Sequence, residues 1–157
     1  MTPTSGDRAP DFELLSDTGE PVKLSDYRGR YIVLYFYPRA DTPSCTKEAC
    51  GFRDDYSVYQ EKGVVILGVS PDTVKQQAKF KAKYDLPFTL LDDTNHQISE
   101  AYDVWGLKKF MGREFMGVKR TTFLIDPDGE IVERFENVKP AEHSKEILDT
   151  LERALEP

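Results

Sequence analysis

The order of apolar segments predicts an α/β fold with helices on both faces of a central mixed β-sheet, which is a three-layer α/β/α sandwich. Two continuous apolar runs, residues 31–37 and 64–69, are each followed by a helical pattern, as expected of parallel strands covered on both faces. The chain then ends in a β-hairpin signal and an amphipathic helix. Because a hairpin contributes antiparallel strands, the predicted sheet is mixed.

The first half of the chain supplies the N-terminal strands and the first long helix. Residues 12–15 and 22–24 flank the turn signal Ser16-Asp17-Thr18-Gly19, and this pattern predicts a small hairpin. The run 31–37 is predicted to be the first long strand. A helix over 43–62 follows it, because apolar residues recur there at steps of three and four and Gly63 ends the pattern.

The second half alternates shorter elements in the same way. The turn signal Asp126-Pro127-Asp128-Gly129 between two apolar runs predicts a terminal hairpin. The predicted elements of this half are strand 64–69, helix 70–84, strand 88–91, helix 95–102, strands 121–125 and 130–135, and helix 141–155.

The length and net charge of the chain indicate its domain count and disfavour some kinds of partner. With 157 residues, no linker and no repeat, residues 1–157 are predicted to form one domain. The formal net charge of −7 disfavours nucleic acid as a partner, because nucleic-acid binders carry a basic face. The sequence shows neither a targeting pattern at its start nor an apolar run long enough to span a bilayer, so we expect a soluble cytoplasmic protein.

Cys45 is the residue that most directly suggests chemistry. It follows strand 31–37 and is placed in the first turn of a helix, with Thr42 as the N-cap and Pro43 at the first helical position. Unpaired N–H groups and the helix dipole favour negative charge there, and such positions lower a thiol pKa from about 8.5 to between about 3.5 and 7.5. We therefore expect Cys45 to be a nucleophilic thiolate and not a packing residue.

Cys50, the second of the two cysteines, lies five residues after Cys45. In an ideal helix this spacing puts the two Cα atoms about 8.7 Å apart, whereas a disulfide needs less than about 7 Å. The pair is neither a CxxC exchange motif nor a zinc-ligand pattern. It indicates two separate roles, in which Cys45 reacts first and Cys50 reacts after the helix has unwound locally.

The segment around Cys45 resembles the active-site signature of peroxiredoxins. Pro38-x-x-x-Thr42-x-x-Cys45 is similar to that signature, and the longer run from Phe36 to Cys50 resembles the bacterioferritin comigratory protein or peroxiredoxin Q subgroup. The resemblance extends from Ala9-Pro10-Asp11-Phe12 to the run 120–126. Ser44 departs from the glycine that is usual in the subgroup, and we expect it to stiffen the turn without affecting the chemistry.

The resemblance implies a thioredoxin-like fold and a thiol-dependent peroxidase. It implies that Cys45 is the peroxidatic cysteine, that Cys50 is the resolving cysteine, and that Thr42 and Arg120 complete the site. The expected reaction reduces hydrogen peroxide and organic hydroperoxides through a Cys45 sulfenic acid, which Cys50 resolves as an intramolecular disulfide. A thioredoxin or similar dithiol donor is the implied reductant, the implied oligomeric state is a monomer, and no metal, haem or flavin is expected.

The physical roles of the site residues follow from the reaction. Negative charge builds on the leaving oxygen as the O–O bond breaks, so the site needs donors aimed there. The Arg120 guanidinium supplies fixed donors and permanent charge, and its strand is expected to lie beside the one that leads to Cys45. The Thr42 hydroxyl is expected to donate to the sulfur or to accept from the peroxide. Pro38 is expected to shape the loop and exclude water.

Two other functions remain open from the sequence. One is a general thiol-disulfide oxidoreductase on the same fold, which the missing CxxC motif disfavours. The other is a non-catalytic redox sensor that passes its oxidation to a partner protein. The role of Glu48 also stays open between orienting an arginine and favouring the helix dipole, while His96 and His143 are interpreted as exposed polar residues.

The segment 105–120 mixes apolar and basic residues. We favour a loop laid over the core, and the alternative is a mobile rim near the active site that meets the electron donor or a bulky hydroperoxide. The residues concerned are Trp105, Lys108, Lys109, Phe110, Met111, Arg113, Phe115, Met116, Lys119 and Arg120.

Overall fold

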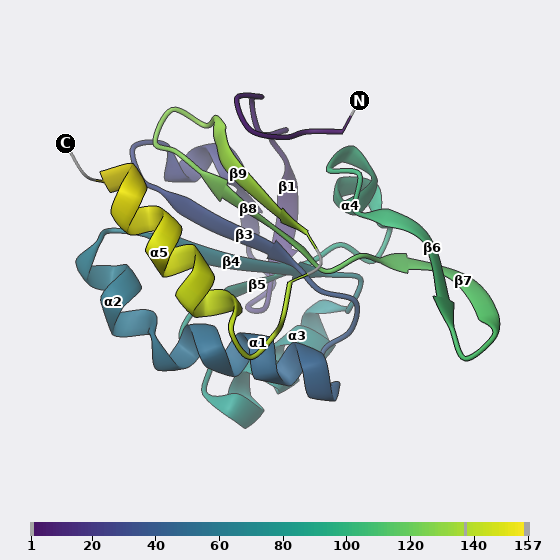
Figure 1. Ribbon diagram of the computed structural model, residues 1–157. Coiled ribbons are helices and arrows are strands. Elements are labelled where there is room, and N and C mark those ends of the chain that lie inside the picture. Colours follow the sequence, from purple (N-terminus) through teal and green to yellow (C-terminus); the bar gives the residue numbers. More distant parts are fainter. Residues whose placement is uncertain (1, 137, 156–157) are drawn as a thin grey trace.

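The computed structural model describes residues 2–136 and 138–155, with the side chain of Phe110 outside that description. Within these residues, seven strands form one sheet in the order β2-β1-β5-β4-β3-β8-β9, shown in Figure 1. The strands of this sheet are β1 (Glu13–Ser16), β2 (Pro21–Lys23), β3 (Ile32–Phe36), β4 (Val65–Ser70), β5 (Thr89–Asp92), β8 (Thr121–Ile125) and β9 (Ile131–Glu136).

The sheet combines parallel and antiparallel pairs. The central strand β3 is parallel to β4 and antiparallel to β8, and β4 is parallel to β5. The two ends of the sheet are antiparallel hairpins, β1–β2 and β8–β9. The predictions of a mixed sheet and of both hairpins are therefore confirmed.

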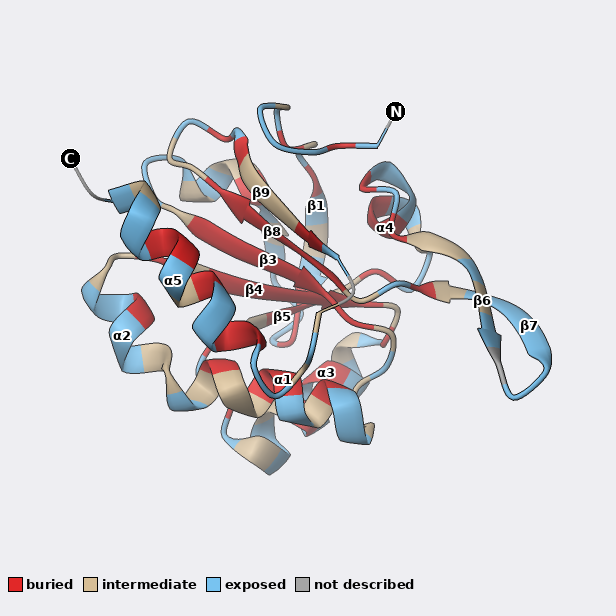
Figure 2. Cartoon of the chain, in the orientation of Figure 1, coloured by how far each residue is buried: buried red, intermediate tan, exposed pale blue. Residues whose placement is uncertain are grey.

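Helices cover both faces of the sheet. The helical elements are η1 (Leu24–Tyr27), α1 (Pro43–Asp54), α2 (Tyr56–Glu61), α3 (Val74–Tyr84), α4 (Gln97–Ala101) and α5 (His143–Leu155). Alternate residues of β3 face two apolar clusters, one with α1, α2, α3 and α5 and the other with η1 and α4. Figure 2 shows the buried residues concentrated on the sheet and on the helix faces turned toward it. The predicted thioredoxin-like three-layer sandwich is thus confirmed.

The long helix predicted over 43–62 is divided in two. Asp55 has φ −97° and ψ 6° and separates α1 from α2. The Ser144 hydroxyl donates to the Asp55 carboxylate at 2.7 Å, which ties the junction to the start of α5. Apolar periodicity continues through the break, because Phe52 and Tyr59 are both buried against the same cluster, and for this reason the pattern did not reveal it.

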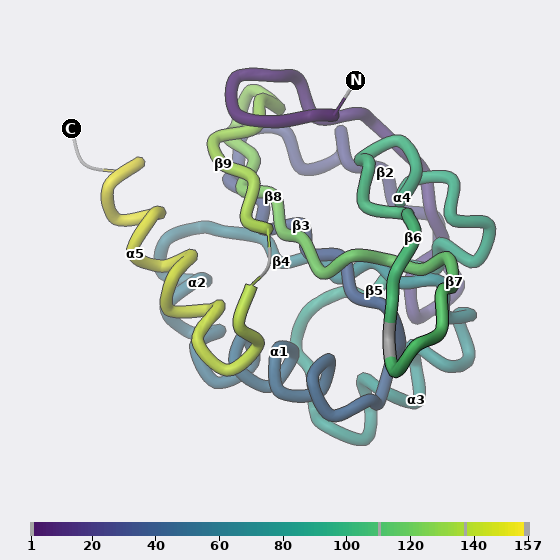
Figure 3. Tube along the Cα trace, turned by 45° about the vertical axis from the view of Figure 1, so that its right-hand side comes forward, coloured from purple at the N-terminus to yellow at the C-terminus, as the bar shows by residue number. Residues whose placement is uncertain are grey.

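The prediction of a loop over the core at 105–120 is wrong. The segment forms a separate antiparallel hairpin of β6 (Trp105–Phe110) and β7 (Arg113–Val118). Figures 1 and 3 show the hairpin extending away from the main sheet, with its two strands side by side. Leu107, Met111 and Met116 are exposed on it, whereas Trp105 and Val118, which pair at its base, pack against one of the apolar clusters of the core.

Among the helices of the described chain, none combines the length and apolar content that crossing a membrane requires.

Candidate active site

Cys45 lies in the first turn of α1, the helix that follows β3 along the chain. Thr42 is the N-cap with extended backbone, φ −96° and ψ 156°, and Pro43 occupies the first helical position, as the sequence predicts. The Cys45 side chain faces the sheet, where the residue is 1% exposed. The thiol therefore lies where helix N–H groups are available and bulk water is largely excluded.

Arg120 contacts the Cys45 sulfur. Its Nη2 donates to Sγ at 3.1 Å, while its Nη1 donates to Glu48 Oε1 at 2.7 Å. The contact depends on the register of the sheet, because Thr121, the first residue of β8, is opposite Phe36, the last residue of β3. The expected neighbourhood of Arg120 and Cys45 is present in the structure.

Glu48 holds Arg120 from the other side. Its carboxylate projects from the buried face of α1 and is 0% exposed in its ion pair with Arg120. Burial raises the pKa of Glu48 to about 7, although the Arg120 charge opposes the rise. The geometry favours an orienting role for Glu48, which the sequence left open. One guanidinium nitrogen of Arg120 donates to the Glu48 carboxylate and the other donates to the Cys45 sulfur.

Thr42 and Pro38 lie in the loop between β3 and α1. The Thr42 hydroxyl donates to the Arg39 carbonyl at 2.9 Å, and among the described hydrogen bonds it has none to Cys45. Its expected donation to the sulfur is therefore not seen, because the loop carbonyl takes its proton. Pro38 is half-buried next to Tyr37 at the end of the first long strand.

Residues of other elements anchor this loop, and the sequence did not identify them. The Asp72 carboxylate accepts from the Ala40 N–H at 2.7 Å and from the Ser70 hydroxyl at 2.6 Å. Asp41, which has φ +60°, accepts from Lys83 Nζ at 2.8 Å and from the Tyr84 hydroxyl at 2.7 Å. The contacts of the loop residues Ala40 and Asp41 join residues more than 30 positions apart, so no local pattern signals them.

Cys50 lies on the same helix as Cys45, and both are free thiols, with Cys50 half-buried. Both residues are helical, so the separation of about 8.7 Å expected from helix geometry applies. A bond between the two sulfurs therefore requires α1 to unwind between them. Arg53, three residues beyond Cys50, donates to the Tyr84 carbonyl at 2.8 Å and fixes the next turn to the end of α3.

His143 is buried, and the interpretation of this residue as an exposed polar side chain is wrong. It lies against the Phe52 and Phe135 rings, and its Nε2 is hydrogen-bonded to the Thr122 hydroxyl at 2.6 Å. Burial, with a smaller effect of the Arg120 charge, lowers the pKa of His143 to about 4. His96 is half-buried and stacks on Trp105 with ring centroids 3.9 Å apart.

Protonation of His143 is expected to destabilise the protein in acid. Between pH 6.5 and 4 the unfolded chain binds the proton and the folded chain does not, so its contribution of about 3 kcal/mol is lost as pH falls through this window. The measurement is the free energy of unfolding at pH 6.5 and pH 4 for the parent and for His143→Phe. The variant is expected to lose about 3 kcal/mol less than the parent, and equal losses would contradict the prediction.

The comparison with the His143→Phe variant is necessary because Glu48 changes the pH dependence of stability in the opposite direction. Its raised pKa means that the folded chain binds the extra proton between pH 4.5 and 7, so its contribution to stability falls as pH rises. This contribution is common to the parent and to His143→Phe. It therefore cancels in the difference between the two proteins.

No group of three or more histidine, cysteine, aspartate or glutamate side chains in ranges 2–136 and 138–155 is arranged to hold a metal ion. The polar groups at the sulfur are the helix start and the Arg120–Glu48 pair. Such a site can hold a thiolate and stabilise negative charge on an atom bonded to the sulfur.

The chain is similar to a known protein family and to curated relatives. The model of the AhpC/TSA family matches residues 5–134. Peroxiredoxin Bcp of Bacillus subtilis is 54% identical over 151 residues, which cover 96% of each chain.

Solved structures are similar over most of the chain. The crystal structure of a mutant PrxQ from Xylella fastidiosa has a TM-score of 0.93 at 32% identity and covers 99% of both chains. The bacterioferritin comigratory protein of Xanthomonas campestris, whose structures concern its alkyl peroxide reduction activity, has a TM-score of 0.87 at 33% identity and covers 92% of both. The match to the family model and the 54% identity to a curated relative show that the chain belongs to the AhpC/TSA family, as one of its Bcp peroxiredoxins.

Proposed function

We propose that this thiol-dependent peroxidase uses Cys45 as its peroxidatic cysteine and Cys50 as its resolving cysteine. The observation that carries the assignment is the donation from Arg120 Nη2 to Cys45 Sγ at 3.1 Å while Glu48 holds the same guanidinium at 2.7 Å. A permanently charged fork fixed in this way stabilises a thiolate and a peroxide oxygen beside it without further rearrangement.

The reaction proceeds in two chemical steps. The Cys45 thiolate attacks one peroxide oxygen, an S–O bond forms, the O–O bond breaks, and the second oxygen leaves with the electron pair and takes up a proton. Cys45 becomes a sulfenic acid. After α1 unwinds, the Cys50 thiol gives up its proton and attacks the Cys45 sulfur, an S–S bond forms, the S–O bond breaks, and the hydroxyl group leaves with that proton as water.

The substrates are peroxides, and we propose both hydrogen peroxide and organic hydroperoxides. Alkyl peroxide reduction by the Xanthomonas campestris relative supports the organic class. An external dithiol reduces the disulfide, and a thioredoxin is the proposed donor. We further propose that residues 1–157 act as one domain in a cytoplasmic monomer, with Thr42 and Pro38 shaping the pocket around the sulfur.

The test is a coupled assay with NADPH, thioredoxin reductase and thioredoxin. The reduced protein is expected to consume NADPH when hydrogen peroxide or tert-butyl hydroperoxide is added, and not to accelerate insulin reduction by dithiothreitol. Insulin reduction without peroxide turnover would favour a thiol-disulfide oxidoreductase. If Cys45 is oxidised once and no dithiol donor then sustains peroxide turnover, the result would favour a redox sensor.

A further inference from the structure

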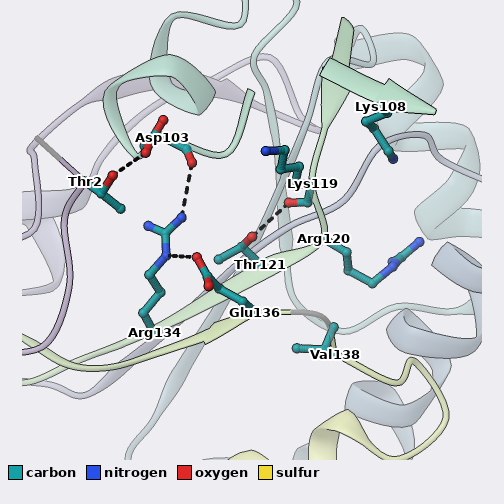
Figure 4. Close-up of a pocket in the computed structure, with 9 residues that line it drawn as sticks. All are labelled: Thr2, Asp103, Lys108, Lys119, Arg120, Thr121, Arg134, Glu136 and Val138. Atoms are coloured by element: carbon teal, nitrogen blue, oxygen red, sulfur yellow. Dashed lines mark hydrogen bonds and ion pairs between the residues drawn. The ribbon is translucent and has the colours of Figure 1, made fainter. Parts of the chain in front are cut away.

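Lys108 is a lysine of the β6–β7 hairpin that lies beside the active site. Its Nζ donates to the Val118 carbonyl at 3.0 Å, two residues before Arg120. Lys108 and Arg120 line the same pocket, of about 530 Å³. Figure 4 shows the ends of the two side chains directed toward one region. The hairpin therefore brings a second cation to the side of Arg120.

A glycine makes room for the course of this side chain. Lys108 is paired with Phe115 in the hairpin register and lies on the same face as Gly117. A Cβ on Gly117 would approach Lys108 Cδ to 3.1 Å and Phe115 Cε2 to 3.5 Å. The aliphatic part of Lys108 thus passes over Gly117, which leads its amine to the Val118 carbonyl.

The neighbouring Lys109 does not lie near Val118 or Arg120. Lys109 is on the opposite face of the hairpin, with its side chain 75% exposed and its Nζ 3.5 Å from Glu114. Lys108 is half-buried. The two residues have the same side chain and adjacent positions, so Lys109 is a matched control for Lys108.

The surroundings make Lys108 a better acid than an ordinary lysine. Partial burial lowers its pKa, the Arg120 charge lowers it further, and Cys45 opposes the change. The amine therefore experiences the field of both active-site groups. An ammonium with a lowered pKa gives up its proton more readily than that of an ordinary lysine.

Two other polar groups near the sulfur, Arg120 and Thr42, are less suited to give a proton. Arg120 stays protonated in proteins, and its Nη1 and Nη2 are engaged with Glu48 and Cys45. The Thr42 hydroxyl donates to a loop carbonyl. Lys108 uses one N–H on the Val118 carbonyl, and an ammonium has three, which leaves two for a ligand.

We propose that Lys108 is a further catalytic residue, which donates a proton to the leaving oxygen of the peroxide. This role rests on the proposed function, because it concerns the same attack by Cys45. As the S–O bond forms and the O–O bond breaks, the departing oxygen takes the electron pair. It then takes a proton from the Lys108 ammonium and leaves as water or an alcohol, and the amine regains a proton from solvent.

The test varies the leaving group. Hydrogen peroxide and tert-butyl hydroperoxide release strongly basic oxygens that need a proton, whereas peracetic acid releases acetate, which does not. Second-order rates of Cys45 oxidation are measured by stopped flow for the parent, Lys108→Met and Lys109→Met. Alkylation of Cys45 by iodoacetamide, in which no oxygen leaves, reports the reactivity of the thiolate alone.

For Lys108→Met we expect a loss of about 10²-fold with both hydroperoxides and of less than about threefold with peracetic acid and iodoacetamide. Lys109→Met is expected to match the parent with all four reagents. Equal losses with hydroperoxides and peracetic acid would overturn the proposal and indicate that Lys108 only holds Arg120 in place. Unchanged hydroperoxide rates would also overturn it. A parent that oxidises slowly with every peroxide would instead contradict the proposed function.

Discussion

The Cys45→Ser variant is expected to lose all measurable peroxide reduction. A serine hydroxyl is not ionised near neutral pH and does not reduce a peroxide, so the nucleophile and the electrons of the first step are both removed. The measurement is hydrogen peroxide consumption by the reduced variant in a single turnover and in the thioredoxin-coupled assay. The parent is expected to be active in both.

The loss must be separated from a folding defect. Cys45 is buried, but serine is slightly smaller than cysteine and its hydroxyl can accept from Arg120 Nη2 in place of the sulfur. We therefore expect a cooperative thermal transition and an unchanged circular dichroism spectrum. Peroxide consumption by a folded Cys45→Ser variant at the parent rate would show that the nucleophile lies elsewhere.

The Arg120→Met variant is expected to oxidise about 10² to 10³ times more slowly than the parent. Removal of one preorganised donor from a site of developing negative charge has this effect on rate, and Arg120 donates a hydrogen bond to the sulfur. The measurement is the second-order rate of Cys45 oxidation by hydrogen peroxide. Arg120→Lys is expected to recover only part of the loss, because it restores the charge without the fork.

The control for Arg120→Met concerns its ion-pair partner. Removal of Arg120 leaves the buried Glu48 carboxylate without its partner, which typically costs about 3–5 kcal/mol of stability. The double variant Arg120→Met/Glu48→Gln removes that unpaired charge and is expected to regain stability but not rate. A double variant with the parent's rate would contradict a direct role for Arg120 at the sulfur.

The single variant Glu48→Gln tests whether Arg120 needs a charged partner or only a hydrogen-bond acceptor. It keeps an acceptor for Arg120 Nη1 but removes the charge that strengthens the hydrogen bond. We expect a loss of about tenfold, smaller than that of Arg120→Met, because a neutral partner orients the guanidinium less firmly.

The elements of the sheet were predictable because each leaves a local signal. Strands buried on both faces are continuous apolar runs, and the turn residues at 16–19 and 126–129 mark the two hairpins. Cys45 was recognisable for the same reason, since a strand, an N-cap and a proline precede it within a few positions. The hairpin at 105–118 was missed because its alternation is weak, with exposed apolar residues on both faces.

Long-range contacts account for the other differences. Glu48 meets Arg120 over 72 positions, and Asp41 meets Tyr84 over 43. His143 was assigned to the surface because a histidine near a helix start is usually exposed, yet α5 places it against Phe52 and Thr122. Lys108 lies in a segment that the sequence predicted to be a loop over the core, with a mobile rim near the active site as the alternative. Each of these residues acquires its environment only when the sheet and the helices pack.

The most direct test of the account is the intact mass and free-thiol count of the reduced protein, quenched rapidly after one equivalent of hydrogen peroxide. The parent is expected to lose both thiols quickly and two mass units, as an intramolecular Cys45–Cys50 disulfide requires. Cys50→Ser is expected to oxidise as fast and to gain one oxygen, which dimedone traps at Cys45, while Cys45→Ser stays unchanged. Slow oxidation of the parent, at the rate of an ordinary thiol, would contradict the activation of Cys45 on which the account depends.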